Sequence, residues 1–171
     1  YIYALVNRGI LSGYPDKTFR PDNEVTRGEY LTLLFKTVCV LDENIVSEDI
    51  HDSMGNFDFY SFREYERIEF LQSFPRTEYK PPYSDLENHW SKNYVAWVKN
   101  YCDKKDPNLF KKIFPGESFY PDQPITREES VLVTTAFMAS PVRSRGIEFK
   151  DVTPDYEFYD EIMNLVNNGI I

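Results

Sequence analysis

The chain contains the same stretch of sequence twice, 100 residues apart. Residues 18–29 read TFRPDNEVTRGE, and residues 118–129 read SFYPDQPITREE. The two ends also match, because IYALVNRGIL at residues 2–11 returns as IMNLVNNGII at residues 162–171. A chain that repeats a unit in this way folds as an array in which each unit packs against its neighbours.

The repeated unit has a fixed order of local signals. An aromatic-x-Asp-apolar segment, YSDL at 83–86 and FKDV at 149–152, precedes an apolar helix that closes with Gly-Ile. A turn follows, GYPDKT at 13–18, in which Pro fixes φ and Asp can bond its own backbone. Thr-Arg-x-Glu then opens a second helix.

Because both ends of the chain fall within the same helix of the unit, we interpret the chain as a fragment of a longer protein, about two repeat lengths long. We divide it into the C-terminal part of unit one (1–38), an insert or linker (39–82), unit two (83–139, with a loop insertion at 103–112), a linker (140–148) and the N-terminal part of unit three (149–171).

Each Thr-Arg-x-Glu segment is a capping box. The hydroxyl of Thr26 or Thr126 accepts from the amide three residues on, and the glutamate there, Glu29 or Glu129, reaches back to the threonine amide. The predicted fold class is all-α, with helix–loop–helix repeats and a partly helical insert between them. The expected helices lie at residues 27–38 and 127–139 after the boxes, at 1–9, 94–102 and 162–169 before the turns, and within 57–74 in the insert.

The net charge of −9 is concentrated in the insert. Residues 42–69 hold nine acidic residues and two arginines, so the rest of the chain is close to neutral. An acidic chain argues against a nucleic-acid partner, which selects basic surfaces. No apolar run approaches the ~18 residues needed to span a membrane, so no membrane insertion is expected. Cys39 and Cys102 lie among apolar residues, which favours two free thiols over a disulfide between them.

Four segments together resemble the S-layer homology repeat. They are GILSGYPDKTFRPDNEVTRGEY (9–30), YSDLENHWSKNYV (83–95), PITREE (124–129) and FKDV with the closing GII (149–171). The resemblance implies a helical module, usually of three repeats, at one end of a secreted bacterial protein. It implies non-covalent anchoring of a surface or S-layer protein through a secondary cell wall polysaccharide associated with peptidoglycan, commonly one with pyruvylated amino sugars. The implied location is extracellular, at the bacterial cell surface or wall.

The resemblance also implies which residues bind the polysaccharide. The arginine of Thr-Arg-x-Glu is the best-known ligand contact of the family, in a groove between neighbouring repeats. The capping residues Thr26, Glu29, Thr126 and Glu129 are expected to be structural. By position, the polysaccharide-binding residues carried over are Arg27, Arg127, Asp85, Trp90, Gly13 and Asp151.

Physical chemistry leaves two roles open for these residues. A helix start exposes unpaired amides and the positive end of the dipole, and a guanidinium there adds a planar fork suited to a carboxylate. The alternative for each arginine is an internal pair with a neighbouring aspartate that holds the repeats together. Asp85 and Asp151 are equally well interpreted as caps or turn residues. Trp90 is open between ligand contact and core packing, whereas Trp97, inside the first helix of unit two, is expected in the core.

Departures from the family pattern motivate a second hypothesis. Unit three has Glu157 where the family has Trp, and unit two has Phe114 and Gly116 where the family has Gly-Tyr-x-Asp. The rival function is therefore a degenerate module that acts as a structural or protein–protein interaction domain of a surface protein. The apolar stripes of the incomplete terminal repeats also make a homodimer a possible assembly.

Catalytic chemistry finds no support in the sequence. A Gly-x-Ser-x-Gly elbow is absent. The two histidines, His51 and His89, are isolated and lack the spacing of a metal-binding helix. Neighbouring acids such as Glu128 and Glu129 diverge by about 100° around a helix, so they do not form a glycosidase pair. We expect a protein that is not an enzyme, with no cofactor and no metal.

Overall fold

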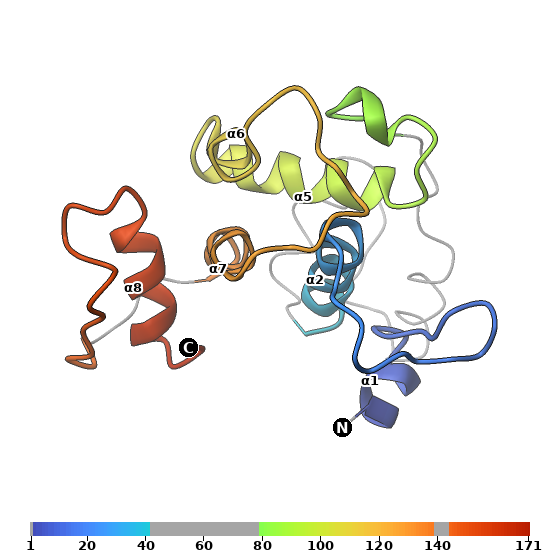
Figure 1. Ribbon diagram of the computed structural model, residues 1–171, viewed down its shortest axis with the longest axis horizontal. Helices are drawn as coiled ribbons and strands as arrows, with labels where there is room; N and C mark the ends of the chain where they lie inside the picture. Colours follow the sequence, from blue (N-terminus) through green and yellow to red (C-terminus); the bar gives the residue numbers. More distant parts are fainter. Residues whose placement is uncertain (1, 42–78, 139–143) are drawn as a thin grey trace, which may run out of the picture.

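The computed structural model describes residues 2–41, 79–138 and 144–171 (Figure 1). Within these ranges the chain forms helices joined by loops, and the pairing of extended backbone is limited to an isolated antiparallel bridge between Thr26 and Pro124. The insert helix predicted within 57–74 lies outside the described residues. The helices are α1 (Ile2–Asn7), α2 (Arg27–Leu41), the 3-10 turn η2 (Ser84–Leu86), α5 (Lys92–Lys105), α6 (Leu109–Ile113), α7 (Arg127–Thr135) and α8 (Tyr159–Asn167). None of these described helices is long and apolar enough to cross a bilayer.

The second helices begin where the capping boxes predict. Both α2 and α7 start at the arginine directly after the capping threonine. In the first box, Thr26 Oγ1 accepts from the Glu29 amide at 3.2 Å, and the Glu29 carboxylate accepts from the Thr26 amide at 2.9 Å. The same two distances are both 3.1 Å for Thr126 and Glu129. Both capping boxes are therefore confirmed, while the S-layer homology arrangement of the repeats stays a prediction.

The segment 103–112 differs from the loop expected there. It continues α5 as far as Lys105 and then enters the short helix α6. Leu109, Phe110 and Ile113 of α6 are all buried, Phe110 completely. Apolar residues at this spacing share one face of a helix, and burying that face stabilises the helix. The insertion therefore adds a helix to the core of unit two.

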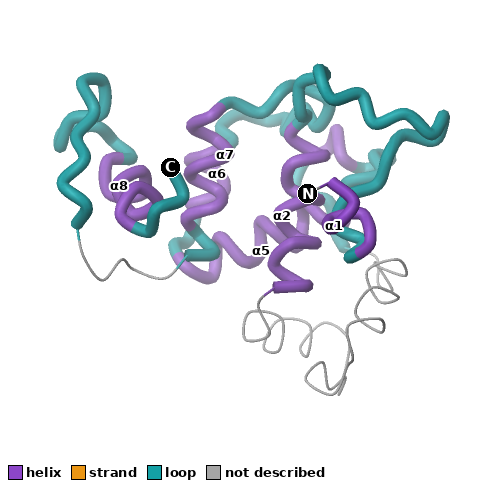
Figure 2. Tube along the Cα trace, turned by 90° about the horizontal axis from the view of Figure 1, so that it is seen from below, coloured by secondary structure: helices purple, strands orange, loops and turns teal. Residues whose placement is uncertain are grey.

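Each second helix packs against the first helix of the following unit. α2 lies against α5, and α7 lies against α8 (Figure 1 and Figure 2). At the first contact, the Phe35 ring meets Trp97 edge-on at 4.8 Å and Tyr94 at 5.4 Å between ring centroids. Trp97 is 4% exposed, which confirms its predicted place in the core. A smaller apolar cluster joins α7 to α8 and consists of Val131, Ile162, Leu165 and Val166.

The matching first helices α1 and α8 differ in how they are covered. Ile2, Leu5 and Val6 of α1 are exposed, whereas their equivalents in α8 are buried against α7. Both helices end at a glycine with positive φ, 69° at Gly9 and 76° at Gly169, as the Gly-Ile signal predicts. The homodimer expected from the exposed stripe stays a prediction.

Both cysteines are free, buried thiols, as the sequence favours. Neither Cys39 nor Cys102 forms a disulfide. Burial raises the pKa of the Cys39 thiol far above its ordinary value and raises the pKa of Cys102 to about 12. Because the thiolate is the reactive form, neither cysteine is a nucleophile at neutral pH.

Candidate functional site

The two Thr-Arg-x-Glu motifs lie side by side at a seam between units one and two. The loops before α2 and α7 run antiparallel here and exchange backbone hydrogen bonds across the seam. Because both helices start at this seam, the side chains at the start of one helix lie close to those of the other. The bonds run from the Arg27 amide to the Gln123 carbonyl (2.8 Å), from the Gly28 amide to the Pro121 carbonyl (2.9 Å) and from the Ile125 amide to the Val25 carbonyl (3.0 Å).

The guanidinium of Arg27 is held inside this seam. Nη2 lies 2.5 Å from Oε1 of Glu129, and Nε donates to Oε2 of the same carboxylate at 3.2 Å. Nη1 donates to the Phe119 carbonyl at 2.8 Å. The guanidinium carbon lies 5.5 Å from the centroid of the Phe114 ring. The side chains of Arg27 and Glu129 are 16% and 13% exposed, so the pair is shielded from solvent.

This geometry is the internal pair that the sequence leaves open as one role for Arg27, but its partner is a glutamate and not the expected aspartate. The pair is bidentate, which is the strong arrangement for a guanidinium and a carboxylate. It joins the start of α2 to the capping glutamate of α7, so it holds two repeats together. A ligand contact by Arg27 stays a prediction, and its guanidinium would have to leave Glu129 to make one.

Arg127 occupies the equivalent position in the second motif but has a different environment. Its side chain is exposed at the first turn of α7. Within the described part of the chain, it forms no hydrogen bond or ion pair. The Arg127 guanidinium is therefore available to an external anion.

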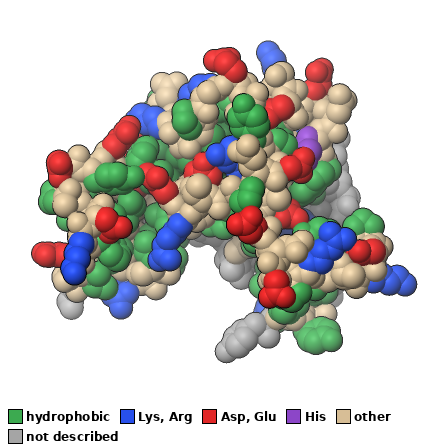
Figure 3. Space-filling model, in the orientation of Figure 1, with side chains coloured by type: hydrophobic (Ala, Val, Ile, Leu, Met, Phe, Trp, Pro, Cys, Tyr) green, Lys and Arg blue, Asp and Glu red, His purple; other side chains and the backbone are tan. Residues whose placement is uncertain are grey.

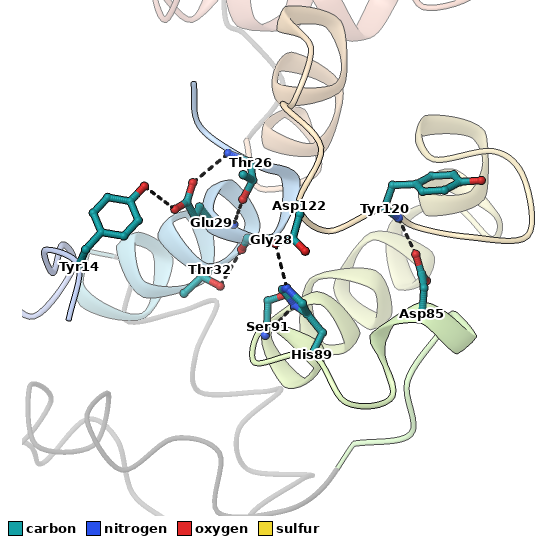
Figure 4. Close-up of polar contacts among 10 residues, drawn as sticks. All are labelled: Tyr14, Thr26, Gly28, Glu29, Thr32, Asp85, His89, Ser91, Tyr120 and Asp122. Atoms are coloured by element: carbon teal, nitrogen blue, oxygen red, sulfur yellow. Dashed lines mark hydrogen bonds and ion pairs between the residues drawn. The ribbon is translucent and has the colours of Figure 1, made fainter. Parts of the chain in front are cut away.

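The two predicted aspartates differ in their contacts. Asp85 accepts from two consecutive backbone amides, that of Phe119 at 3.1 Å and that of Tyr120 at 2.7 Å, and Figure 4 shows the bond to Tyr120. This clamp ties η2 to the loop before α7, which is a structural role. Asp151, the equivalent residue in unit three, is exposed and forms no hydrogen bond to the other described residues. The ligand role predicted for both aspartates is untested.

Trp90 lies on the surface beside the seam. It is 56% exposed, so the core position left open by the sequence is wrong. Its ring centroid is 5.3 Å from that of His89, whose Nε2 lies 3.3 Å from Asp122 and whose Nδ1 lies 2.8 Å from the Ser91 hydroxyl (Figure 4). Trp90 is therefore presented to solvent from a connection that is fixed to unit two.

The loop that contains Gly13 closes over the first capping box. The Tyr14 amide donates to the Thr18 carbonyl at 2.9 Å, and the Tyr14 hydroxyl donates to Glu29 at 3.0 Å. Bonds from the Thr18 side chain and from Arg20 to the Asp16 carboxylate, together with a bond from the Thr18 amide, lower the pKa of Asp16 to about 2. A Cβ at residue 13 would lie 2.7 Å from the Thr18 carbonyl oxygen, so the turn requires glycine there.

Alanine in place of Gly13 is therefore expected to reduce the free energy of unfolding by about 1–3 kcal/mol, the usual cost of forcing backbone apart. Equilibrium unfolding in urea measures the loss. Lys17→Gly is a control in the same loop, because Lys17 has a φ of 65° that glycine adopts without strain. We expect this control to change stability by less than about 0.5 kcal/mol. An unchanged unfolding midpoint for Gly13→Ala would show that the loop tolerates the side chain.

Two side-chain contacts at the seam could not be predicted from the residues next to them in the sequence. Glu129 is predicted as a cap, yet it also pairs with Arg27, 102 residues away. The contact of His89 with Asp122 also joins distant segments. The repeat itself is the available hint, because two copies of a motif can meet where their units pack.

Neither a metal site nor a uniform charge on the face shown in Figure 3 marks the described residues. No group of three or more His, Cys, Asp or Glu side chains among them is placed to hold a metal ion. On the face shown in Figure 3, acidic and basic side chains are interspersed.

Comparison with known proteins confirms the family resemblance. The S-layer homology domain model matches residues 1–31, which include the turn and the first Thr-Arg-x-Glu motif. The chain is 26% identical over 164 residues to the cellulosome-anchoring protein of Acetivibrio thermocellus. This alignment covers 94% of this chain and 28% of the relative. It is 23% identical over 159 residues to cell surface glycoprotein 1 of the same organism, and that alignment covers 92% of this chain and 6% of the relative. The chain thus spans a minor part of both relatives, and no solved structure is significantly similar to it.

Proposed function

We propose that this chain, whose residues 1–31 match the S-layer homology domain model, is a non-catalytic module that binds a secondary cell wall polysaccharide and tethers a surface protein to the bacterial envelope. Its location is extracellular, at the cell surface, as the family and the two cell-surface relatives indicate. The proposed ligand carries pyruvylated amino sugars, each of which offers a ketal carboxylate beside a sugar ring.

The observation that carries this proposal is the exposed guanidinium of Arg127. It stands at the first turn of α7, where unpaired amides and the helix dipole favour an anion. The equivalent Arg27 demonstrates how the motif holds a carboxylate, because its guanidinium contacts both oxygens of Glu129. Arg127 has the same place in its motif, and its guanidinium is exposed, so it offers the same planar fork to the ketal carboxylate of the ligand.

The remaining predicted residues enter the proposal in two ways. Trp90 is exposed and offers an aromatic face to a sugar ring. Gly13 and Asp85 shape the loops of units one and two, and their proposed contribution is to position the binding surface. Asp151 is proposed as a polar contact from unit three, where its carboxyl group is exposed.

Co-sedimentation with purified cell walls tests the proposal. We expect the chain to pellet with walls that retain the secondary polymer and to stay in the supernatant with walls from which the polymer has been stripped. Pre-incubation with a soluble pyruvylated amino sugar is expected to release it from the walls. Equal binding to both wall preparations would contradict a polysaccharide ligand.

A second candidate function is a structural or protein-interaction module. The Arg27–Glu129 pair and the Asp85 clamp favour it, because two of the predicted ligand residues, Arg27 and Asp85, are engaged within the fold. This candidate predicts no binding to either wall preparation. It also predicts that the loss of Arg127 changes neither wall binding nor stability, which separates it from the anchoring function.

A further inference from the structure

We propose that Tyr120 is a second aromatic contact for the polysaccharide, presented at the seam by the Asp85 clamp. This inference rests on the function proposed above and adds a residue that neither the motif pattern nor the family resemblance identifies. It comes from the backbone of the loop before α7, from the contrast with unit one and from the position of Trp90.

The backbone of Tyr120 has a conformation that an aromatic residue rarely adopts. Its φ is 57°, in the left-handed region where Cβ crowds the following carbonyl oxygen. Two contacts hold it there. The Phe119 side chain is completely buried, and the Asp85 carboxylate accepts from the amides of both Phe119 and Tyr120. The loop is thus fixed on either side of the Tyr120 ring.

Unit one shows what a side chain at this position does when it serves the fold. Arg20, the equivalent residue, has a φ of 54°. Its guanidinium lies 4.0 Å from the Tyr14 ring centroid, pairs with Asp16 at 2.8 Å and donates to Thr18 at 3.0 Å. The Tyr120 side chain is 53% exposed and has no hydrogen bond or aromatic contact with the described residues. The strained backbone therefore presents a ring whose hydroxyl and aromatic face are free.

Trp90 lies on the segment that is tied to this loop. The segment formed by η2 and its connection to α5 joins the loop at two points, through Asp85 of η2 and through the contact of His89 with Asp122 (Figure 4). Figure 4 shows the Tyr120 ring pointing away from the Asp85 carboxylate. Trp90 and Tyr120 are thus two exposed aromatic side chains on segments that are held together.

Two such rings suit a sugar chain. A sugar ring has apolar C–H faces and a polar edge, and tyrosine likewise combines an apolar face with a polar hydroxyl. A single exposed aromatic residue would be ordinary for a protein surface. An exposed aromatic residue that is clamped in an unfavourable backbone conformation, on a loop tied to the segment of a second exposed aromatic residue, indicates a role in binding.

Tyr120→Gly separates binding from folding. Glycine removes the ring and adopts positive φ without strain, so the urea midpoint of unfolding is expected to stay the same or rise. Affinity for polymer-bearing walls is expected to fall about three- to tenfold, the usual value of one aromatic contact. Tyr120→Phe keeps the ring and should bind within about twofold of the parent. Tyr3→Ala removes an 83% exposed aromatic residue on α1 and should bind as the parent does.

Each outcome decides the inference. Weaker binding by Tyr120→Gly, with unchanged folding and with parental binding by Tyr3→Ala, supports it. Parental binding by Tyr120→Gly overturns it and leaves the anchoring function in place. Failure of the parent chain itself to bind polymer-bearing walls overturns the anchoring function and this inference together.

Discussion

Replacing Arg27 with alanine is expected to lower the free energy of unfolding by about 2–3 kcal/mol. The guanidinium contacts both oxygens of the Glu129 carboxylate and the carbonyl of Phe119, so the variant loses three interactions across the seam. It also leaves a carboxylate that is 13% exposed without its cation. Breaking a fully buried pair costs about 3–5 kcal/mol, and the residual exposure of this pair reduces that value. Equilibrium unfolding in urea measures the loss.

Arg127→Ala is the matched control, because it removes the same side chain from the same position of the repeat. Arg127 is exposed and has no partner in the described part of the chain. Its loss is therefore expected to change the free energy of unfolding by less than about 0.5 kcal/mol. Equal destabilisation by the two variants would contradict the division between a structural and an available arginine.

The same Arg127→Ala variant is expected to bind polymer-bearing walls about 1.5–3 kcal/mol more weakly, which is a loss of roughly 10- to 150-fold. The reason is that a charge-assisted, bidentate contact with the ketal carboxylate is lost. Arg127→Lys keeps the charge without the planar fork, so an intermediate loss is expected. A sedimentation isotherm measures all three proteins.

Lys150→Ala controls for a general effect of charge on wall binding. Lys150 is an exposed cation in unit three, outside the seam. We expect this variant to bind as the parent does. If Lys150→Ala and Arg127→Ala weakened binding equally, attraction between the wall and the protein would be non-specific, and Arg127 would have no special role.

The helix starts could be predicted because their signals are local. A capping box is complete within four residues, so Thr26 and Thr126 fix the start of α2 and α7 whatever the rest of the chain does. The glycine that ends a helix is equally local, and Gly9 and Gly169 both have positive φ. Trp97 was predictable as core because it lies within an apolar helix.

The roles of the side chains at the seam depend on contacts between units. The same motif places one arginine in a shielded ion pair and the other in solvent, and this difference arises from the presence of Glu129 beside Arg27. No pattern within the motif distinguishes the two. The position of Trp90 follows from how the connection before α5 packs, and the burial of Phe110 creates α6 where the comparison between repeats predicts a loop.

Titration with a pyruvylated amino sugar, followed by amide chemical shifts, tests the central claim most directly. We predict that the amides of residues 126–129 shift in a saturable manner, while those of residues 26–29 stay in place because the Arg27 guanidinium is held by Glu129. An absence of shifts at residues 126–129, or equal shifts at both motifs, would contradict the assignment of saccharide binding to Arg127.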